Sequence, residues 1–231
     1  APTRRAWQRQ NEFVAAAGHE LRSPLAVIKA SLAAAEDPAL PEARRRGFLH
    51  TAQREADRLA RLTGDLQLLA AGDAGALTVR PGPVAADTLC IEVYEQFYLL
   101  ARAQGRRLTL QLPEAPLPPL VTDGGRLTQL LTILLQNALD HTPPGTPVEL
   151  TLQPAPGRLR LRVIDHGPGI PDDRKEQVFD RFFRADASRT RKENFGLGLS
   201  VARELARGLG AALTLADTPG GGATFTVDLP A

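Results

Sequence analysis

The chain has 231 residues, and its 28 lysines and arginines nearly balance 26 aspartates and glutamates, leaving a formal net charge of +2. Aromatic residues make up only 5% of it. This composition argues against a nucleic-acid partner, because such sites favour excess basic residues and stacking side chains. The single cysteine, Cys90, excludes an intrachain disulfide and a thiolate metal site, and it favours a reducing, cytoplasmic compartment.

The sequence has no apolar run near the ~20 residues that a membrane span requires. Residues 1–10 are polar and lack the pattern of a signal peptide. We therefore expect no membrane contact by this chain itself. It begins at Ala1 and contains no methionine, so a larger protein with an N-terminal sensor, membrane-bound or not, is an open interpretation.

Residues 4–71 show no strand pattern, and two prolines within residues 36–41 interrupt an otherwise helical periodicity. This predicts a hairpin of two helices with apolar stripes at heptad-like spacing. The stripes are Trp7, Val14, Gly18, Leu21, Leu25, Ile28 and Leu32 in the first arm, and Phe48, Ala52, Leu59, Leu62, Leu66 and Leu69 in the second. Because a hairpin alone leaves such stripes exposed, we expect a homodimer that forms a four-helix bundle.

After a linker rich in glycine and proline, residues 72–83, the pattern changes to strands mixed with helices. Four segments alternate apolar and polar residues as half-buried strands do: 108–112, 148–152, 159–163 and 225–229. Three amphipathic helices are expected to cover one face of the sheet: 84–103, 124–139 and 199–209. The prediction is a helical dimerisation hairpin, residues 1–74, followed by an α/β two-layer sandwich, residues 75–231.

The first helix places His19 beside the apolar stripe, on the outer side, with Glu20 next to it and Ser23 one turn later. A neutral imidazole is a nucleophile near neutral pH, and a neighbouring carboxylate can accept its ring proton. This group suits phosphoryl capture, although a lone exposed histidine is more often part of an ordinary surface. Pro24 should kink the helix just beyond the site.

The run from His19 to Pro24, H-E-L-R-S-P, resembles the phospho-acceptor box of the histidine kinase dimerisation domain. The resemblance implies that His19 is phosphorylated and that Glu20 assists as a base. It also implies that the residue at position 23 positions water for dephosphorylation of the regulator. Since Ser23 stands where the family usually has Thr or Asn, phosphotransfer is implied more firmly than phosphatase activity.

The second region contains two glycine-rich segments. Residues 165–170, D-H-G-P-G-I, follow a strand, and residues 196–200, G-L-G-L-S, open a helix whose free backbone N–H groups can receive a phosphate. Between them lie residues 179–184, F-D-R-F-F-R, and a polar stretch. Upstream, Asn137 lies at the edge of the apolar stripe of an amphipathic helix. Taken alone, a D-x-G-x-G segment is as often a turn as a site.

In this order and spacing, these segments resemble the N, D-x-G-x-G, F and G-x-G boxes of the histidine kinase catalytic domain, which has the Bergerat-type ATP-binding fold of gyrase and MutL. By that resemblance, Asn137 binds Mg²⁺ and Asp165 recognises the adenine amino group of ATP. The other residues assigned to the nucleotide site are Gly167 and Gly169 at the base, Phe182 and Phe183 below a lid of residues 185–195, Gly196, Gly198 and Leu199 at the phosphates, and Thr224 near the adenine.

Together the boxes imply a two-component sensor histidine kinase. Such an enzyme uses ATP to phosphorylate its own His19 and passes the phosphoryl group to an aspartate of a response regulator, with regulator phosphatase as a further activity. Two rivals stay open. One is a catalytically weakened, nucleotide-binding dimeric scaffold. The other is a different ATPase of the same superfamily, against which the hairpin with His19 argues.

Some positions depart from the family pattern. Ile133 stands where Asn is common, and Asp140 replaces a Lys or Arg that would meet the phosphates. Asp140 would then repel the phosphates or, less favoured, become an extra Mg²⁺ ligand. Glu193 and Asn194 replace the common Gly-Gly of the lid, which should stiffen it. We expect a working but slow kinase.

Overall fold

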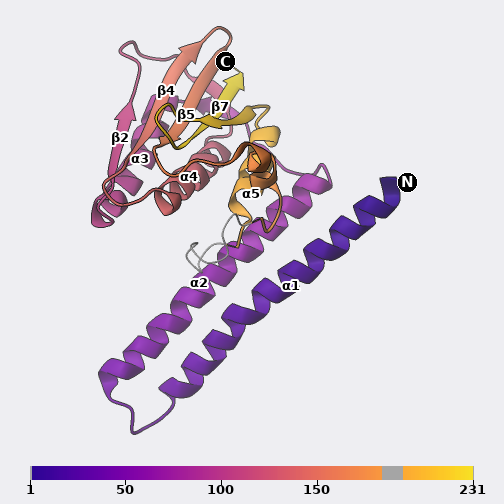
Figure 1. Ribbon diagram of the computed structural model, residues 1–231, viewed down its shortest axis with the longest axis vertical. Helices are drawn as coiled ribbons and strands as arrows, with labels where there is room; N and C mark the ends of the chain where they lie inside the picture. Colours follow the sequence, from indigo (N-terminus) through magenta and orange to yellow (C-terminus); the bar gives the residue numbers. More distant parts are fainter. Residues whose placement is uncertain (1, 184–194, 231) are drawn as a thin grey trace. The chain divides into compact units, whose positions relative to one another are not determined.

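The computed structural model describes residues 2–183 and 195–230, with side chains from residue 13 onward. It divides the chain into two compact units, residues 1–70 and 71–231. The first unit is helical and the second is built on a β-sheet (Figure 1). The predicted order, a helical region followed by an α/β domain, is confirmed.

The first unit is a hairpin of two long helices, α1 (Pro2–Ala35) and α2 (Glu42–Asp73), whose last three residues belong to the second unit. The helix α1 continues through Pro24, so the proline removes one backbone hydrogen bond without ending the helix. In the turn, the Asp37 carboxylate accepts from Ala39 N at 2.9 Å. In the described part of the chain, none of the helices is both long and apolar enough to cross a membrane.

The predicted apolar stripe of α1 is partly open to solvent in the single chain, with Leu21 and Ile28 half-buried. Val14 is 62% exposed, Leu25 51% and Leu32 45%. Exposed apolar side chains that lie together are typical of surfaces that bind a protein, a membrane or a ligand. The side chain of Trp7, the first residue of the predicted stripe, lies outside the described residues.

The second unit contains a five-stranded sheet in the order β2-β4-β5-β7-β6, in which β2 and β4 are parallel and the other neighbours are antiparallel. A separate two-stranded sheet pairs β1 with β3. The elements are β1 (Gly82–Val84), α3 (Ala86–Ala103), β2 (Arg107–Gln111), β3 (Leu120–Thr122), α4 (Gly124–His141), β4 (Pro147–Ala155), β5 (Arg158–Asp165), the 3₁₀ turns η1 (Asp172–Arg174) and η2 (Gln177–Phe179), α5 (Gly198–Gly208), β6 (Ala212–Asp217) and β7 (Ala223–Pro230).

One face of the large sheet is covered by helices, as predicted. The strands β5 and β7 bury every second residue, and α3, α4 and α5 contact the sheet through β2, β4, β5 and β6. The core contains fully buried leucines of α4, among them Leu127, Leu130, Leu131 and Leu134, together with Phe225 of β7. The four predicted strands and three predicted helices of this unit are all present, whereas β1, β3 and β6 were not predicted.

Candidate active site

The acceptor candidate of the first unit lies on α1. His19 and Ser23 are exposed, and Glu20 is half-buried. Because residues four apart on a helix share a face, the imidazole and the Ser23 hydroxyl lie on the same side of α1, one turn apart. The structure therefore leaves His19 open to a second reactant, as the sequence predicts.

The second unit holds a buried carboxylate at the end of β5. Asp165 is only 5% exposed, and its Oδ1 accepts hydrogen bonds from Gly167 N at 2.9 Å and Ala223 N at 3.2 Å. Burial raises the pKa of Asp165, and these two bonds and the nearby His141 and His166 partly oppose the rise. Both bonds reach Oδ1, so Oδ2 can accept from a further donor.

The glycines around Asp165 are required by close backbone contacts. A Cβ on Gly167 would lie 3.0 Å from Asp165 Oδ1 and 3.3 Å from His141 O. Gly169 has a φ of 74°, which favours glycine. The strictest position is Gly222, with a φ of 109°, where a Cβ would lie 2.0 Å from Asp165 O. The turn after β5 and the turn before β7 therefore meet at van der Waals distance.

Asn137 lies between two contacts that α4 makes with the glycine-rich segments. Ile133 Cγ2 is 3.4 Å from the position of a Cβ on Gly198, which opens α5, and His141 O is 3.3 Å from the position of a Cβ on Gly167. Residues 133, 137 and 141 follow one another at spacings of four, so they lie along one face of the helix. The half-buried Asn137 side chain is thus flanked by the G-x-G box on one side and the D-x-G-x-G box on the other.

The F and G boxes cross at a narrow point. Gly196 has a φ of 72°, and a Cβ there would lie 2.7 Å from Phe183 O and 2.9 Å from the carbonyl carbon of Phe182. Phe182 itself has a φ of 61°, unusual for a residue other than glycine. Two residues after Gly196, α5 begins at Gly198, and Leu199 is half-buried in its first turn. The lid residues 185–194, with Glu193 and Asn194, lie outside the described residues.

A cavity of about 360 Å³ lies beside the D-x-G-x-G turn. It is lined by Pro168, Gly169, Ile170, Pro171, Asp217, Thr218, Gly221 and Gly222. At the edge of this cavity, Lys175 Nζ donates hydrogen bonds to Asp172 and to Asp217, the latter at 2.6 Å. Asn137 and Asp165 are not among the lining residues of this cavity, so it adjoins the D-x-G-x-G turn rather than containing both groups.

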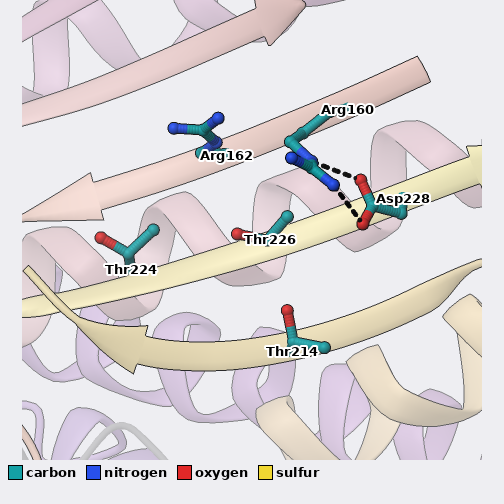
Figure 2. Close-up of a pocket in the computed structure, with 6 residues that line it drawn as sticks. All are labelled: Arg160, Arg162, Thr214, Thr224, Thr226 and Asp228. Atoms are coloured by element: carbon teal, nitrogen blue, oxygen red, sulfur yellow. Dashed lines mark hydrogen bonds and ion pairs between the residues drawn. The ribbon is translucent and has the colours of Figure 1, made fainter. Parts of the chain in front are cut away.

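Thr224, which the resemblance places near the adenine, does not share a face of the sheet with Asp165. Its side chain lies on the uncovered face of the sheet, beside a shallow basin of about 270 Å³ that also includes Arg160, Thr226 and Asp228 (Figure 2). Asp165 belongs to the buried alternation of β5, on the opposite face. Strand alternation explains the difference, because residue 223 rather than 224 shares the face of Asp165. The Thr224 hydroxyl instead bonds the Thr218 hydroxyl at 2.8 Å.

Three further residues lie beside Asp165 or Gly167 and are absent from the sequence prediction. Ala223 contributes a backbone N–H to Asp165, and Gly222 permits the close contact described above. Thr142, which ends α4, is 1% exposed, and its hydroxyl has no hydrogen-bond partner among the described residues. The period-two pattern of β7 could have identified the first of these, since it places residue 223 with the buried residues 225 and 227.

Both units match known families. Residues 9–75 match the profile described as the His Kinase A (phospho-acceptor) domain. Residues 122–231 match the profile described as Histidine kinase-, DNA gyrase B-, and HSP90-like ATPase. His19 falls in the first match, while Asn137, Asp165 and Gly198 fall in the second.

The chain is 37% identical over 224 residues to the probable sensor histidine kinase TcrY of Mycobacterium tuberculosis, which covers 95% of this chain and 45% of that protein. It spans about half the length of the curated relatives it matches. Among solved structures, full-length ShkA in complex with AMPPNP aligns with a TM-score of 0.71 and 28% identity, covering 95% of this chain and 45% of that one.

A further structure, histidine kinase ThkA in complex with the response regulator protein TrrA, aligns with a TM-score of 0.73, covering 98% of this chain and 63% of that one. At 20% identity this likeness is one of fold. A phospho-acceptor hairpin and an ATPase domain therefore follow one another in a single chain, in the order found in its relatives. The chain belongs to the family of two-component sensor histidine kinases.

Proposed function

We propose that this chain is the catalytic part of a sensor histidine kinase, which transfers the γ-phosphate of ATP to its own His19 and then to an aspartate of a response regulator. One observation carries the proposal. The same chain presents an exposed imidazole in its phospho-acceptor unit and, in its ATPase unit, a buried carboxylate fixed by two backbone N–H groups. The first suits a phosphoryl acceptor and the second suits recognition of an amino group on a base.

The transfer requires few covalent steps from the protein. A ring nitrogen of His19 attacks the γ-phosphorus, the new N–P bond replaces the bond to the bridging oxygen, and ADP leaves. The displaced imidazole proton passes to the Glu20 carboxylate. In the second step the N–P bond breaks, and the phosphoryl group moves to a carboxylate oxygen of the regulator. Exposure of His19 is what both partners need.

The ATPase unit supplies positioning. Asp165 accepts a hydrogen bond from the adenine amino group through Oδ2, while the backbone N–H groups at the start of α5, around Gly198 and Leu199, face the phosphates. An Mg²⁺ ion would be held by the Asn137 amide oxygen and would neutralise phosphate charge when bound. The residues fit such an ion, because Asn137 lies between contacts to both glycine-rich boxes and Asp140 lies one turn further along α4.

Asp140 bears directly on the rate. Its Oδ1 accepts from Gln136 Nε2 at 2.9 Å, and the residue is half-buried. A carboxylate one turn after Asn137 repels bound phosphates unless a metal ion neutralises its negative charge. We therefore keep the expectation of a slow kinase.

The homodimer is proposed from the exposed stripe of α1. Val14, Leu25 and Leu32 are each more than 40% exposed, and a second copy can bury them in a four-helix bundle. A response regulator is proposed as the partner that receives the phosphoryl group, in line with the ThkA–TrrA complex on a related fold. Sedimentation that shows only monomer at micromolar concentration would count against the dimer.

Labelled ATP tests the function. Incubation with γ-labelled ATP and Mg²⁺ should give a protein-bound label that acid removes and alkali spares, as expected of a phosphoramidate. His19→Gln should abolish the label and preserve nucleotide binding, whereas Asp165→Asn should weaken nucleotide binding itself. Label that persists in the His19→Gln variant would remove His19 from the mechanism. Nucleotide binding without label in the parent chain would favour the scaffold.

A further inference from the structure

The segment that follows the hairpin is attached to the ATPase unit at defined points. Asp73, the last residue of α2, forms a two-pronged ion pair with Arg181 of the F box, Oδ1 to Nη2 at 2.6 Å and Oδ2 to Nη1 at 2.8 Å. Parallel pairing of a carboxylate with a guanidinium fixes orientation as well as distance. Both residues belong to the second unit, so the contact is internal to it.

The same segment also lies against α5. Arg207 Nη2 donates to Gly72 O at 2.6 Å and to Glu204 Oε2 at 2.7 Å. A Cβ on Gly72 would lie 2.4 Å from that same Glu204 oxygen, and one on Gly208 would lie 2.7 Å from Leu77 Cδ2. Residues 72–77 are therefore held on α5 by a hydrogen bond and by close packing.

The other end of the ion pair lies next to the crossing of the F and G boxes. Arg181 directly precedes Phe182, whose φ of 61° is strained for a residue with a side chain. The backbone of Phe182 and Phe183 touches Gly196, two residues before α5 begins. A strained conformation of this kind persists only when its surroundings hold it. The ion pair with Asp73 fixes Arg181, the residue immediately before Phe182.

We propose that Asp73 is a positioning residue for the nucleotide site, acting through Arg181, and that the end of α2 is thereby coupled to the conformation of the F and G boxes. This inference rests on the proposed function, because it assumes that these boxes hold the nucleotide. Since α2 is one continuous helix from Glu42 to Asp73, a rotation or fraying of its last turn changes the position of the Asp73 carboxylate. The site is then loosened at the Phe182 crossing.

The expected effect is modest and sensitive to salt. The Asp73 side chain is 58% exposed and the Arg181 side chain 27% exposed, so solvent screens the pair. Removing the charge with Asp73→Asn should speed nucleotide dissociation about two- to fivefold, the range that an exposed pair supports. At about 1 M salt, where the Debye length is ~3 Å, the parent chain should approach the variant.

The experiment compares four forms of the full chain: the parent, Asp73→Asn, Asp73→Arg, and Asp73→Arg combined with Arg181→Asp. Dissociation of a fluorescent ATP analogue is followed by stopped flow at low and high salt. The matched control is Glu42→Gln, which removes the same charge from α2 but breaks only pairs with Arg45 and Arg46 within that helix. The inference expects faster dissociation in the Asp73 variants, recovery in the reversed pair, and no change in the control.

An unchanged dissociation rate in Asp73→Asn overturns the inference. Failure of the reversed pair to recover also overturns it, because Arg181 would then act on the nucleotide directly. Amide hydrogen exchange measured without nucleotide tests the coupling independently of the proposed function. Asp73→Asn should raise exchange in residues 74–80 and in residues 179–183 together, and a rise in the first segment alone would refute the coupling. A parent chain that binds no nucleotide defeats the proposed function, while the exchange result still decides the coupling.

Discussion

Gly222 offers the sharpest test of how the ATPase site is built. At this position a Cβ would lie 2.0 Å from Asp165 O, 2.6 Å from His166 Cα and 2.7 Å from Asp165 C. All three are backbone atoms, so no flexible side chain can move aside to relieve the overlap. The neighbouring Gly221 has the same φ of 109°, yet its Cβ would meet only Gly167 O, at 3.8 Å. Comparing alanine variants at Gly221 and Gly222 therefore separates the free-energy cost of the steric overlap from the cost of the positive φ.

The expected magnitudes follow from these contacts. Placing alanine in a conformation that favours glycine costs about 1–3 kcal/mol. This is the whole effect expected for Gly221→Ala. Gly222→Ala adds the overlap with the Asp165 and His166 backbone, which costs about 1–3 kcal/mol more when a packed interior must shift. Against a typical folding free energy of about 5–15 kcal/mol, the combined loss destabilises the unit severely.

The assay must report on the ATPase unit alone. Tryptophan fluorescence cannot do so, because the only tryptophan, Trp7, belongs to the hairpin. Urea denaturation combined with pulsed hydrogen exchange, read on peptides of β5 and β7, meets this need. Gly222→Ala should lower the free energy of unfolding more than Gly221→Ala, and it should also weaken ATP binding by displacing Asp165. Equal stability of the two variants would refute the reasoning, since the turn would then move away from β5 without cost.

Three other predictions address charge. Asp140→Lys should raise the rate of autophosphorylation measured with labelled ATP, because it replaces a repelling carboxylate with a cation; an equal or lower rate contradicts the repulsion argument. Burial raises the pKa of Asp165, so ATP affinity, measured by calorimetry, should begin to fall at a higher pH than it would with an ordinary aspartate, because protonation removes the negative charge and places a donor hydrogen on the carboxyl group, which weakens its acceptance from an amino donor. Asp123→Ala should cost about 0.5–2 kcal/mol of unfolding free energy, because Asp123 caps α4 by accepting from Arg126 N at 3.0 Å. The hydrogen bonds from Arg80 and Arg126 lower the pKa of Asp123, so this contribution should be present above pH ~4 and lost as the pH falls below it.

Much of the fold could be predicted because periodicity is strong where one face is buried. The four predicted strands of the large sheet are those in which polar and apolar residues alternate over at least five positions. The strands β1 and β3 have three residues each, too few for a periodic pattern, and they form through pairing of residues 40 positions apart, Gly82 with Thr122. Four of the six residues of the edge strand β6 are exposed and the other two are half-buried, so burial leaves only a weak pattern in its sequence.

The site could be predicted less completely, because several contributions come from backbone groups. A backbone N–H such as that of Ala223 leaves no mark on residue type. Motif spacing also fixes a segment only to within a residue, and in a strand a shift of one residue moves a side chain to the opposite face. The motif therefore indicates Thr224 for the adenine side, although Ala223 is the residue that shares the face of Asp165. The packing of Ile133 against Gly198 is equally a property of the folded chain.

The roles proposed for His19 and Asp165 need opposite surroundings, and this is a physical reason for placing the two side chains in separate units. Asp165 discriminates among donors only when it is desolvated, because a buried acceptor that loses its partner is costly while an exposed one turns to water. Under the proposed function, His19 meets two different reactants in turn, and an imidazole sealed in a core could meet neither. A single rigid site could not bury one group and expose the other to both a nucleotide and a protein. With the roles proposed, an exposed imidazole on α1 in one unit and a buried carboxylate at the end of β5 in the other meet these two requirements.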